Sequence, residues 1–600
     1  MVLFDYGELA YIFGAGMELQ RHVRIKILSD KGLDEANIKL PYHSYKNDEE
    51  ITDISAQTYN LDGSGNVVVT KVDKKLIYDK KINKRYSEKV FTFPEAKAGS
   101  VIEYKYKLKG AGLIDWYFQE SVPVKHSRFV IDFPQEIEVR VTPFCSRPYE
   151  RTNDQRATRV VQTFAMKNIP AFRDEGYIIN EDDYRDRVET IVSAFIIDGR
   201  RENRVVTWPM VTRFLMEDED FGQQIKKEIP RTADLDAELR TLTDPYLRMK
   251  TIHHYVQNNM EWNGSPGMWA LDGVKAAWKD KKGTQGEINL ILVNLLKDAG
   301  LNAKPLLAST HDNGMVNTIN AGTYDYPGFN QFNKVLAYVE IGNKAYVLDA
   351  TDKETPCHLI PPDLLMTEAL VIEKLETFEW GWKSLWDGER LNKNLILLNG
   401  TINADGKMEG NASINSYDYS RLPRVALARK DKKAYIERFL SISNPGITID
   451  SVSLENLDSD SLPLIQKINF NQTLSSSGDY RFFSANIFTG LEKNPFVADT
   501  RICDVFFGAN QHYSIIGNFT IPADYQFEEM PKNVRIIMPD TSISISRLSQ
   551  ASGNRISFRI TLDFKKPFFS ASEYPEFQAF YKKMFDMLNE QYVIRKKENP

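Results

Sequence analysis

The length, composition and charge of the chain are those of a globular protein with several domains. Its 600 residues are 42% hydrophobic, 26% charged and 12% aromatic, which is enough to fill more than one core. The net charge of -6 excludes a global positive field that would attract nucleic acid or an anionic membrane. Three scattered cysteines exclude a disulfide framework and a cysteine-based metal cluster.

Residues 1–190 predict an N-terminal β-sandwich domain. The stretches His22–Ile27 and Val101–Lys107 alternate apolar and polar residues, which is typical of half-buried strands. Asp62-Gly63 indicates a hairpin turn between two such strands. No basic segment followed by an apolar run opens the chain, so we expect folded structure from the start and no signal peptide. No apolar run approaches the ~20 residues of a membrane-spanning helix.

Residues 191–385 predict a domain with helices and strands. Asp244-Pro245 is typical of a helix start, and Gly300 is typical of a helix end. Between Lys281 and Gly300 the apolar residues recur at helical spacing on one face, namely Ile288, Ile291, Leu292, Leu295, Leu296 and Ala299. Strands are then expected at 304–308, 335–341 and 344–348, with Gly342-Asn343 at a tight turn.

Residues 386–600 predict a β-rich domain that ends in a helix. Ile556–Leu562 alternates with period two, as a half-buried strand does. After Pro575, one helical face carries Phe577, Phe580, Tyr581, Met584 and Leu588. The basic tail at 595–597 follows this helix.

Two segments of the central region resemble the transglutaminase-like superfamily. KKGTQGEINLILVNLLKDAG (281–300) is similar to the loop and helix that carry the family's catalytic Cys after a Gly-x-Cys motif. FNKVLAYVEIGNKAYVLDAT (332–351) is similar to the strands that carry its His and Asp. The resemblance implies an α+β fold with a central papain-like, transglutaminase-like domain between the two β domains. Gln285 stands at the Cys position, Lys334 at the His position and Asp349 at the Asp position.

The resemblance extends to both ends of the chain. Phe91–Lys109 and Pro495–Gly508 resemble β domains of unknown function that flank such cores in Bacteroidetes-type bacterial proteins. Those proteins usually carry a secretion signal, so the resemblance implies the bacterial periplasm or cell envelope, with the cytoplasm as the alternative. The resemblance does not indicate a particular activity, because proteins with this arrangement of domains have no well-defined common function.

The chemistry of the three triad positions argues against a thiol enzyme. Gln285 has no ionisable atom and cannot form an acyl intermediate. Lys334, with an ordinary pKa of ~10.4, is a cation near pH 7 and cannot act as the base. Thr284 is a possible nucleophile but is better interpreted as a helix cap. We therefore predict a degenerate site whose cleft contains Trp262, Thr284, Gln285, Lys334 and Asp349. Lys334 should pair with Asp349, and Gln285 could hydrogen-bond to either.

Other groups of polar residues favour ordinary structure over chemistry. Adjacent Cys357 and His358 point to opposite faces of an extended chain, which makes them a poor catalytic pair. His253-His254 lacks zinc-site spacing, so one ring should face the core and the other solvent. The acidic runs at 181–183 and 217–220 lack the glycine and alternation of a calcium loop. We expect no metal, and no cofactor because phosphate- and dinucleotide-binding glycine motifs are absent from the sequence.

The segment Lys71–Lys89 is the most basic part of the chain. It holds eight basic and three acidic residues, with Tyr78 and Tyr86 between them. Such a pattern occurs in nucleic-acid sites, but the acidic chain as a whole favours a lysine-rich solvent face at a sheet edge. We expect no nucleic-acid partner.

Two hypotheses for the function remain open at this point. The first is a protein that has lost thiol catalysis and binds a peptide, glycan or protein partner as a scaffold. The second is an amide hydrolase or acyl transferase that uses residues not identified above. An open pocket with a titratable nucleophile beside Gln285 would favour the enzyme, whereas a buried, plugged site would favour the binding protein.

Overall fold

The chain is mostly β in a computed structural model that describes residues 1–204, 206–314, 331–373, 381–442, 444 and 446–598. Strands contain 44% of the residues and helices 20%. The expected α+β class with a central papain-like domain is therefore wrong. The prediction of the fold class gave too much weight to two short motifs near 281–300 and 332–351. The strand-rich segments at both ends make up most of the length of the chain.

The N-terminal part is built from three sheets, and its largest sheet has eight strands in the order β12-β13-β10-β1-β2-β8-β4-β5. The bounds of these strands are β1 (Val2–Ile12), β2 (Gly16–Lys26), β4 (Glu50–Leu61), β5 (Val67–Lys71), β8 (Val101–Lys109), β10 (Val124–Pro134), β12 (Glu150–Arg156) and β13 (Arg159–Ile169). The two smaller sheets contain β3 (Asn37–His43), β6 (Tyr78–Lys81), β7 (Tyr86–Thr92), β9 (Trp116–Tyr117), β11 (Ile137–Phe144), β14 (Arg187–Ile197) and β15 (Arg200–Asn203). The predicted hairpin turn at Asp62-Gly63 lies between β4 and β5.

The central part contains most of the helices and one antiparallel sheet in the order β20-β19-β18-β21-β22. Its helices are α1 (Trp208–Glu217), α2 (Ala233–Thr241), α3 (Pro245–Asn259), α4 (Val274–Asp280) and α5 (Gln285–Asp298). Its strands are β16 (Glu261–Trp262), β17 (Lys282–Gly283), β18 (Asn302–Ala308), β19 (Lys334–Ile341), β20 (Lys344–Leu348), β21 (Thr367–Val371) and β22 (Trp382–Leu385). The three predicted strands of this region are confirmed as β18, β19 and β20.

The C-terminal part is an eight-stranded sheet, β25-β26-β24-β23-β30-β34-β33-β32, with smaller sheets beside it. The eight strands are β23 (Asn392–Ile402), β24 (Lys407–Tyr417), β25 (Ile447–Glu455), β26 (Leu464–Thr473), β30 (Gln511–Thr520), β32 (Val534–Ile537), β33 (Ile543–Ser552) and β34 (Arg555–Phe564). The smaller sheets and helices are β27 (Ser475–Ser477), β28 (Tyr480–Ser484), β29 (Val505–Phe506), β31 (Tyr525–Glu529), β35 (Phe568–Phe569), β36 (Gln591–Lys596), α6 (Asp418–Lys430), α7 (Lys432–Ile436) and α8 (Tyr574–Leu588).

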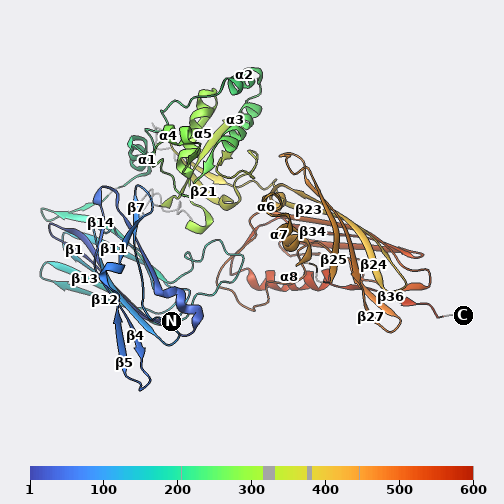
Figure 1. The fold of residues 1–600 in the computed structure, drawn as a ribbon, viewed down its shortest axis with the longest axis horizontal. Coiled ribbons are helices and arrows are strands. Elements are labelled where there is room, and N and C mark those ends of the chain that lie inside the picture. The colour runs from blue at the N-terminus through green and yellow to red at the C-terminus, as the bar shows by residue number, and fades with distance from the viewer. Residues whose placement is uncertain (205, 315–330, 374–380, 443, 445, 599–600) are drawn as a thin grey trace.

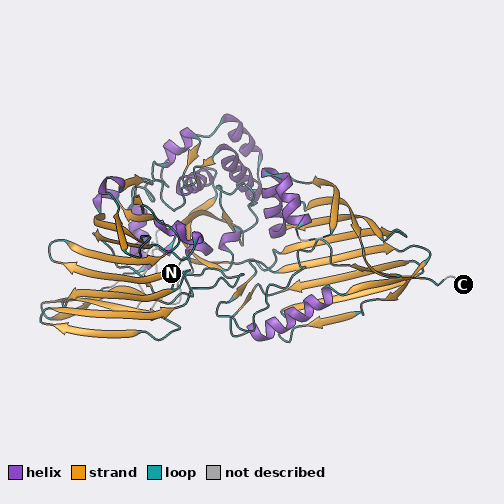
Figure 2. Ribbon diagram, turned by 60° about the horizontal axis from the view of Figure 1, so that its bottom comes forward, coloured by secondary structure: helices purple, strands orange, loops and turns teal. Residues whose placement is uncertain are grey.

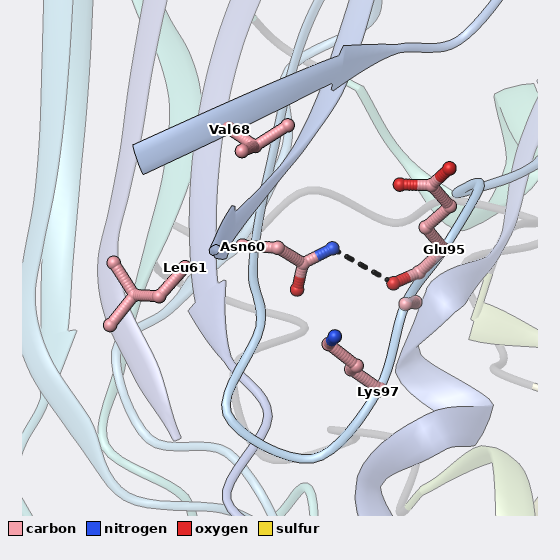
Figure 3. A pocket seen from close by; sticks show the side chains of 6 residues that line it. Asn60, Leu61, Val68, Glu95 and Lys97 are labelled. Carbon is pink, nitrogen blue, oxygen red and sulfur yellow. Dashed lines mark hydrogen bonds between the residues drawn. The ribbon is translucent and has the colours of Figure 1, made fainter. Parts of the chain in front are cut away.

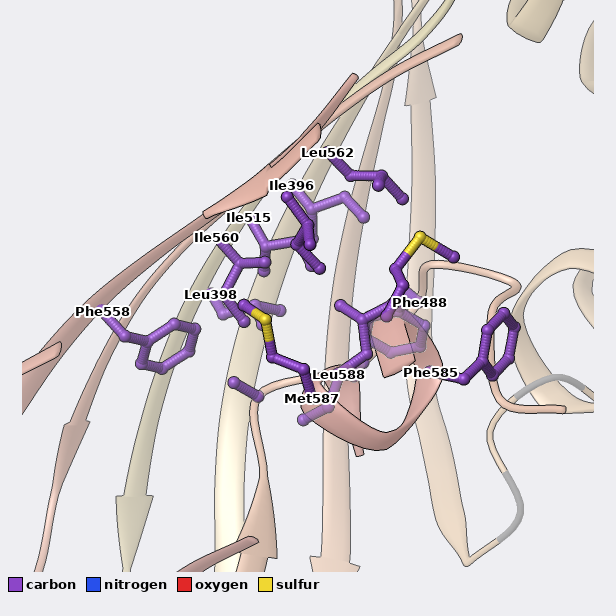
Figure 4. Packing of buried hydrophobic residues seen from close by; sticks show 14 of the residues in the cluster. Ile396, Leu398, Phe488, Ile515, Phe558, Ile560, Leu562, Phe585, Met587 and Leu588 are labelled. Carbon is purple, nitrogen blue, oxygen red and sulfur yellow. The ribbon is translucent and has the colours of Figure 1, made fainter. Parts of the chain in front are cut away.

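Helix α8 supplies one wall of the C-terminal core. Its predicted apolar face is buried, and Figure 4 shows the Met587 side chain directed toward Leu398 of the large sheet. The prediction that the chain ends in this helix is wrong, because β36 follows it and pairs with both β28 and β31.

The three parts meet around the middle of the molecule (Figure 1). Figure 2 shows the helices of the central part above and between the two large groups of strands. The domain boundaries predicted at 190 and 385 stay predictions, and β14 runs through the first of them. Within the described residues, no helix is both long enough and apolar enough to cross a membrane.

Candidate functional site

Helix α5 begins with a complete capping box. The Thr284 hydroxyl accepts a hydrogen bond from Glu287 N at 3.2 Å, and the Glu287 carboxylate accepts one from Thr284 N at 2.8 Å. The same hydroxyl donates to Trp269 O at 3.1 Å. The interpretation of Thr284 as a helix cap is confirmed, and its oxygen is fully engaged in structural bonds.

The loop 263–273 covers the first turn of α5. Gln285 N donates to Ser265 O at 3.1 Å, and the Gln285 side-chain oxygen accepts from Gly267 N at 3.3 Å. A Cβ on Gly286 would lie 2.5 Å from Trp269 O, so only glycine allows this close approach. Among the described residues, Gln285 bonds to this loop and makes no hydrogen bond to Lys334 or Asp349, in contrast to the bond that the sequence suggested.

Lys334 is buried between two carboxylates. Its ammonium lies 2.8 Å from Asp349 Oδ2 and 2.8 Å from Asp363 Oδ2. Only 6% of the Lys334 side chain and 1% of the Asp349 side chain are exposed, whereas Asp363 is 45% exposed. The predicted Lys334–Asp349 pair is confirmed, and Asp363 adds a second carboxylate at the outer side of the ammonium.

Asn289 holds the other side of Asp349. Its amide nitrogen donates to Asp349 Oδ1 at 3.0 Å and to Val335 O at 2.9 Å, and its oxygen accepts from Ala350 N at 2.9 Å. Thr351 adds backbone and hydroxyl bonds to the same Oδ1 atom, at 2.9 Å and 2.5 Å. Asp349 Oδ2 faces the Lys334 ammonium at 2.8 Å. Its ionic contact with Lys334 is therefore what compensates its burial.

Lys334 and Asp349 each favour the charged form of the other. Burial disfavours both ions, but the carboxylates of Asp349 and Asp363 outweigh it and hold the pKa of Lys334 above its ordinary value. Burial likewise opposes ionisation of Asp349, and Lys334 outweighs it, so the pKa of this carboxyl is lowered. Lys334 thus remains a cation across the physiological pH range and cannot accept a proton from a nucleophile.

The two adjacent histidines occupy different environments, as predicted. His253 on α3 is 1% exposed and its ring contacts Asp349 O at 3.2 Å. Burial lowers the pKa of His253 to about 4, so the ring is neutral near pH 7. The partly exposed His254 lies 2.7 Å from Asp460 instead. Neither ring approaches a nucleophile of the predicted cleft.

The remaining predicted cleft residue, Trp262, lies at the surface. It is 43% exposed, and its indole nitrogen donates to Ser265 O at 3.0 Å. Thr284, Gln285, Lys334 and Asp349 are all buried, with exposed fractions between 3% and 8%. Trp262 is the accessible member of this group, and the loop 263–273 separates it from the charges beneath.

The three cysteines are placed as structural thiols. Cys357 contacts Tyr246 Oη at 3.7 Å, while His358 faces Asp418 at 3.9 Å, so the two do not form a pair. Burial raises the pKa of Cys357, and it raises the pKa of Cys145 to about 11 and of Cys503 to about 12. These thiols are protonated at neutral pH and are therefore poor nucleophiles. Within the described residues, no group of three or more His, Cys, Asp or Glu side chains could hold a metal ion.

Sequence reasoning missed three residues of the site. The Thr284-x-x-Glu287 spacing is a capping-box signal that could have identified Glu287. Asn289, one polar residue on an apolar helix, was a weaker signal for a buried hydrogen-bonding role. Asp363 lies in a short 3-10 helix (Pro362–Leu364), and nothing in the local sequence indicates that it contacts Lys334.

Two family models match the ends of the chain. A domain of unknown function, DUF3857, matches residues 16–173, and a second, DUF3858, matches residues 479–594. The expected flanking domains of unknown function are thus present at both ends. No curated protein matches the chain.

One solved structure extends the likeness to the whole fold. A protein from Parabacteroides distasonis, named a "putative protease", superposes with a TM-score of 0.60 over 99% of both chains at 12% identity. A "putative cysteine protease" from Cytophaga hutchinsonii covers 56% of this chain and 75% of its own at 11% identity, with a TM-score of only 0.14. At such low identity, the first structure shows a shared fold and nothing about activity.

Proposed function

We propose that this chain is a binding or scaffold protein for a peptide, glycan or protein partner, and that its transglutaminase-like central site has lost thiol catalysis. The observation that carries the proposal is the Lys334 ammonium buried between Asp349 and Asp363. A thiol enzyme needs a neutral or proton-accepting base at this position, and a doubly paired lysine supplies neither.

The start of α5 supports the same proposal. A nucleophile at a helix N-terminus must be reachable by substrate, and its backbone N–H groups must be available to developing negative charge. Here Gln285 N is bonded to Ser265 O, and the loop that carries Ser265 lies over the helix start. The network of Lys334, Asp349 and Asn289 then stabilises the packing of α5 against β19 and the residues after β20.

A direct assay tests the loss of thiol chemistry. The full chain is incubated with casein, and separately with casein and a fluorescent primary amine, with and without iodoacetamide. We expect neither cleavage nor amine incorporation above the buffer control. Activity that iodoacetamide abolishes, and that substitution of one of the three cysteines removes, would contradict the proposal.

The second candidate function, an amide hydrolase or acyl transferase with other residues, is favoured only by the name of the P. distasonis protein. The same assay distinguishes it, since activity that resists iodoacetamide would support it. Binding is tested separately by affinity capture with the full chain as bait. Trp262→Ala should reduce capture if the partner uses the predicted cleft, and Leu548→Ala, at an exposed site in the C-terminal part, is the matched control.

A further inference from the structure

The strand β5 is an apolar strand at the edge of the eight-stranded sheet. It pairs with β4 on one side and ends the sheet on the other. Val67, Val68 and Val69 are 63%, 43% and 47% exposed, so neither face of the strand is covered. Proteins usually shorten, charge or cover such an edge, because it can pair with another chain. An uncovered run of three valines there is unusual.

The register of the hairpin shows which backbone groups face outward. Asp62 N donates to Asn66 O, and Val72 N donates to Ala56 O, each at 2.9 Å. In an antiparallel ladder the hydrogen-bonded residues alternate, so Val68 and Thr70 also bond to β4. Val67, Val69 and Lys71 therefore turn their N–H and C=O groups toward the open edge. This spacing matches what an added strand requires.

A recess lies beside the same hairpin (Figure 3). Its volume is about 420 Å³ and it is lined by Asn60, Leu61, Val68, Glu95, Ala96 and Lys97. Asn60 Nδ2 donates to Glu95 O at 3.0 Å, which fixes the wall opposite β5. A side chain of an added strand on the Val68 face would be directed toward this recess, with Lys97 at its border.

The surroundings of β5 are basic. Four lysines on β5, in the turn after it and at the recess make no ion pair among the described residues: Lys71, Lys74, Lys75 and Lys97. The neighbouring acids accept hydrogen bonds from the chain itself: Asp62 from Ser64 N and Asn66 N, Asp73 from Lys75 N, and Glu95, at the recess, from the Thr70 hydroxyl at 3.1 Å. A second copy of this chain would bring the same lysines to the contact and be repelled. The charge favours an acidic occupant.

We propose that the open edge of β5 binds an extended, acidic segment of a partner protein as an added strand, with one of its side chains in the recess beside Val68. Main-chain bonds to Val67, Val69 and Lys71 give affinity for any extended chain, and the lysines and the recess select an acidic one. The inference rests on the proposed binding function for its biological role. The contact itself can be tested whether or not the central site is catalytic.

The test uses a fluorescent peptide of repeated Val-Glu and the full chain, with binding measured by fluorescence anisotropy. Val69→Pro removes one outward N–H without touching the ladder to β4, and Val69→Thr is the matched control that keeps it. We expect Val69→Pro to weaken binding at least about tenfold and Val69→Thr less than about threefold. A Val-Lys peptide should bind far more weakly, and added salt should weaken the Val-Glu peptide.

A second measurement keeps the test valid if Val69→Pro perturbs folding. A Val-Glu peptide methylated on alternate backbone nitrogens cannot form the ladder and should not bind the unaltered chain. The proposal is overturned if no Val-Glu peptide binds, if the methylated peptide binds equally well, or if a folded Val69→Pro variant keeps full affinity. Self-association that Val69→Pro abolishes would replace the acidic partner with a second copy. None of these failures would restore thiol activity to the central site, so the two proposals fail separately.

Discussion

At the scale of single residues, the central site is held together by a buried ion pair. Asp349 is buried and charged, which is costly unless a partner compensates it. Lys334 is that partner, and its ammonium lies 2.8 Å from Asp349 Oδ2. Lys334 and Asp349 therefore form a structural ion pair in the core.

Lys334→Ala should destabilise the chain strongly. The pair is desolvated, and removal of one partner from a buried pair leaves the other charge stranded, at a cost of roughly 3–5 kcal/mol. Thermal or urea unfolding of the full chain measures the loss. Lys282→Ala is the matched control, because the Lys282–Glu261 pair is also short, at 2.7 Å, but its side chains are 53% and 67% exposed. Its effect should be below about 1 kcal/mol. Equal effects for the two variants would show that the Lys334 pair is hydrated in solution.

His253 should make the chain less stable in mild acid. Its pKa falls from 6.5 to about 4 in the native state because burial disfavours the imidazolium. Between these values the unfolded chain binds the proton and the native chain does not. Stability is therefore intact above about pH 6.5 and falls as the pH decreases toward 4, by at most about 3 kcal/mol. Asp349 acts in a separate window, below its ordinary pKa of 3.8.

A series of unfolding curves between pH 7 and pH 4 tests the role of His253. His253→Gln should lower stability at pH 7 but flatten its dependence on pH in this range. His254→Gln, at the more exposed neighbour, should keep the steep acid loss. If both variants follow the wild-type slope, the buried ring does not control acid stability.

At the scale of elements, the sequence predicts where α5 begins and ends but underestimates how much of its surface is buried. Thr284 as a cap and Gly300 as a stop predict the two ends of the helix, and the spacing of the apolar residues predicts one buried face. The structure buries α5 on all sides through residue 296, including Leu290, Val293 and Asn294. Periodicity indicates a one-sided helix only where one side meets water, so it cannot predict complete enclosure.

Among the strands, too, some features follow from the local sequence and others depend on contacts with distant segments. β2 and β8 were predicted because their sequences alternate apolar and polar residues. β2 buries Val23 and Ile25 as expected, whereas β8 buries Glu103 as well as Ile102. β36 was missed because its short, basic sequence reads as a tail, although Tyr592 and Ile594 are buried within it. The Lys334–Asp349 contact was predictable from motif order, whereas the return of Asp363 to the same ammonium depends on a loop path that no spacing reveals.

Leu295 tests the enclosure of α5. Leu295 is 0% exposed, so Leu295→Ala should cost roughly 2–5 kcal/mol and Leu295→Asp should unfold the central part. Amide hydrogen exchange along α5, together with thermal unfolding, measures both effects. Lys297→Ala, on the exposed end of the same helix, should cost less than about 1 kcal/mol. A Leu295→Asp protein with native exchange rates would mean that α5 is not in the core.

At the scale of the whole molecule, the parts are joined by contacts between segments far apart in the sequence. Figure 1 shows the chain after β13 passing toward the C-terminal part before it returns to β14. There Phe506 N donates to Tyr177 O at 2.7 Å, and the Tyr177 ring packs on Phe496 and Phe507. On the other side, Arg85 lies 4.0 Å from the Trp269 ring and pairs with Asp220 at 2.7 Å. The N-terminal β part thus contacts both the C-terminal and the central part, and the arrangement does not rest on the linkers alone.

Arg501 tests whether the junction with the C-terminal part holds the molecule together. Its side chain is 3% exposed and donates to Glu175 O and Cys503 O, each at 2.7 Å. Arg501→Met fills similar space without donors, so it leaves these buried carbonyls unpaired at about 1–3 kcal/mol each. We expect faster proteolysis between residues 170 and 185 and a larger maximum dimension in small-angle X-ray scattering. Lys493→Met, at an exposed position of the same region, should change neither. If Arg501→Met also changes neither, the aromatic packing around Tyr177 is sufficient for the junction, and the hydrogen bonds of the arginine do not hold the two parts together.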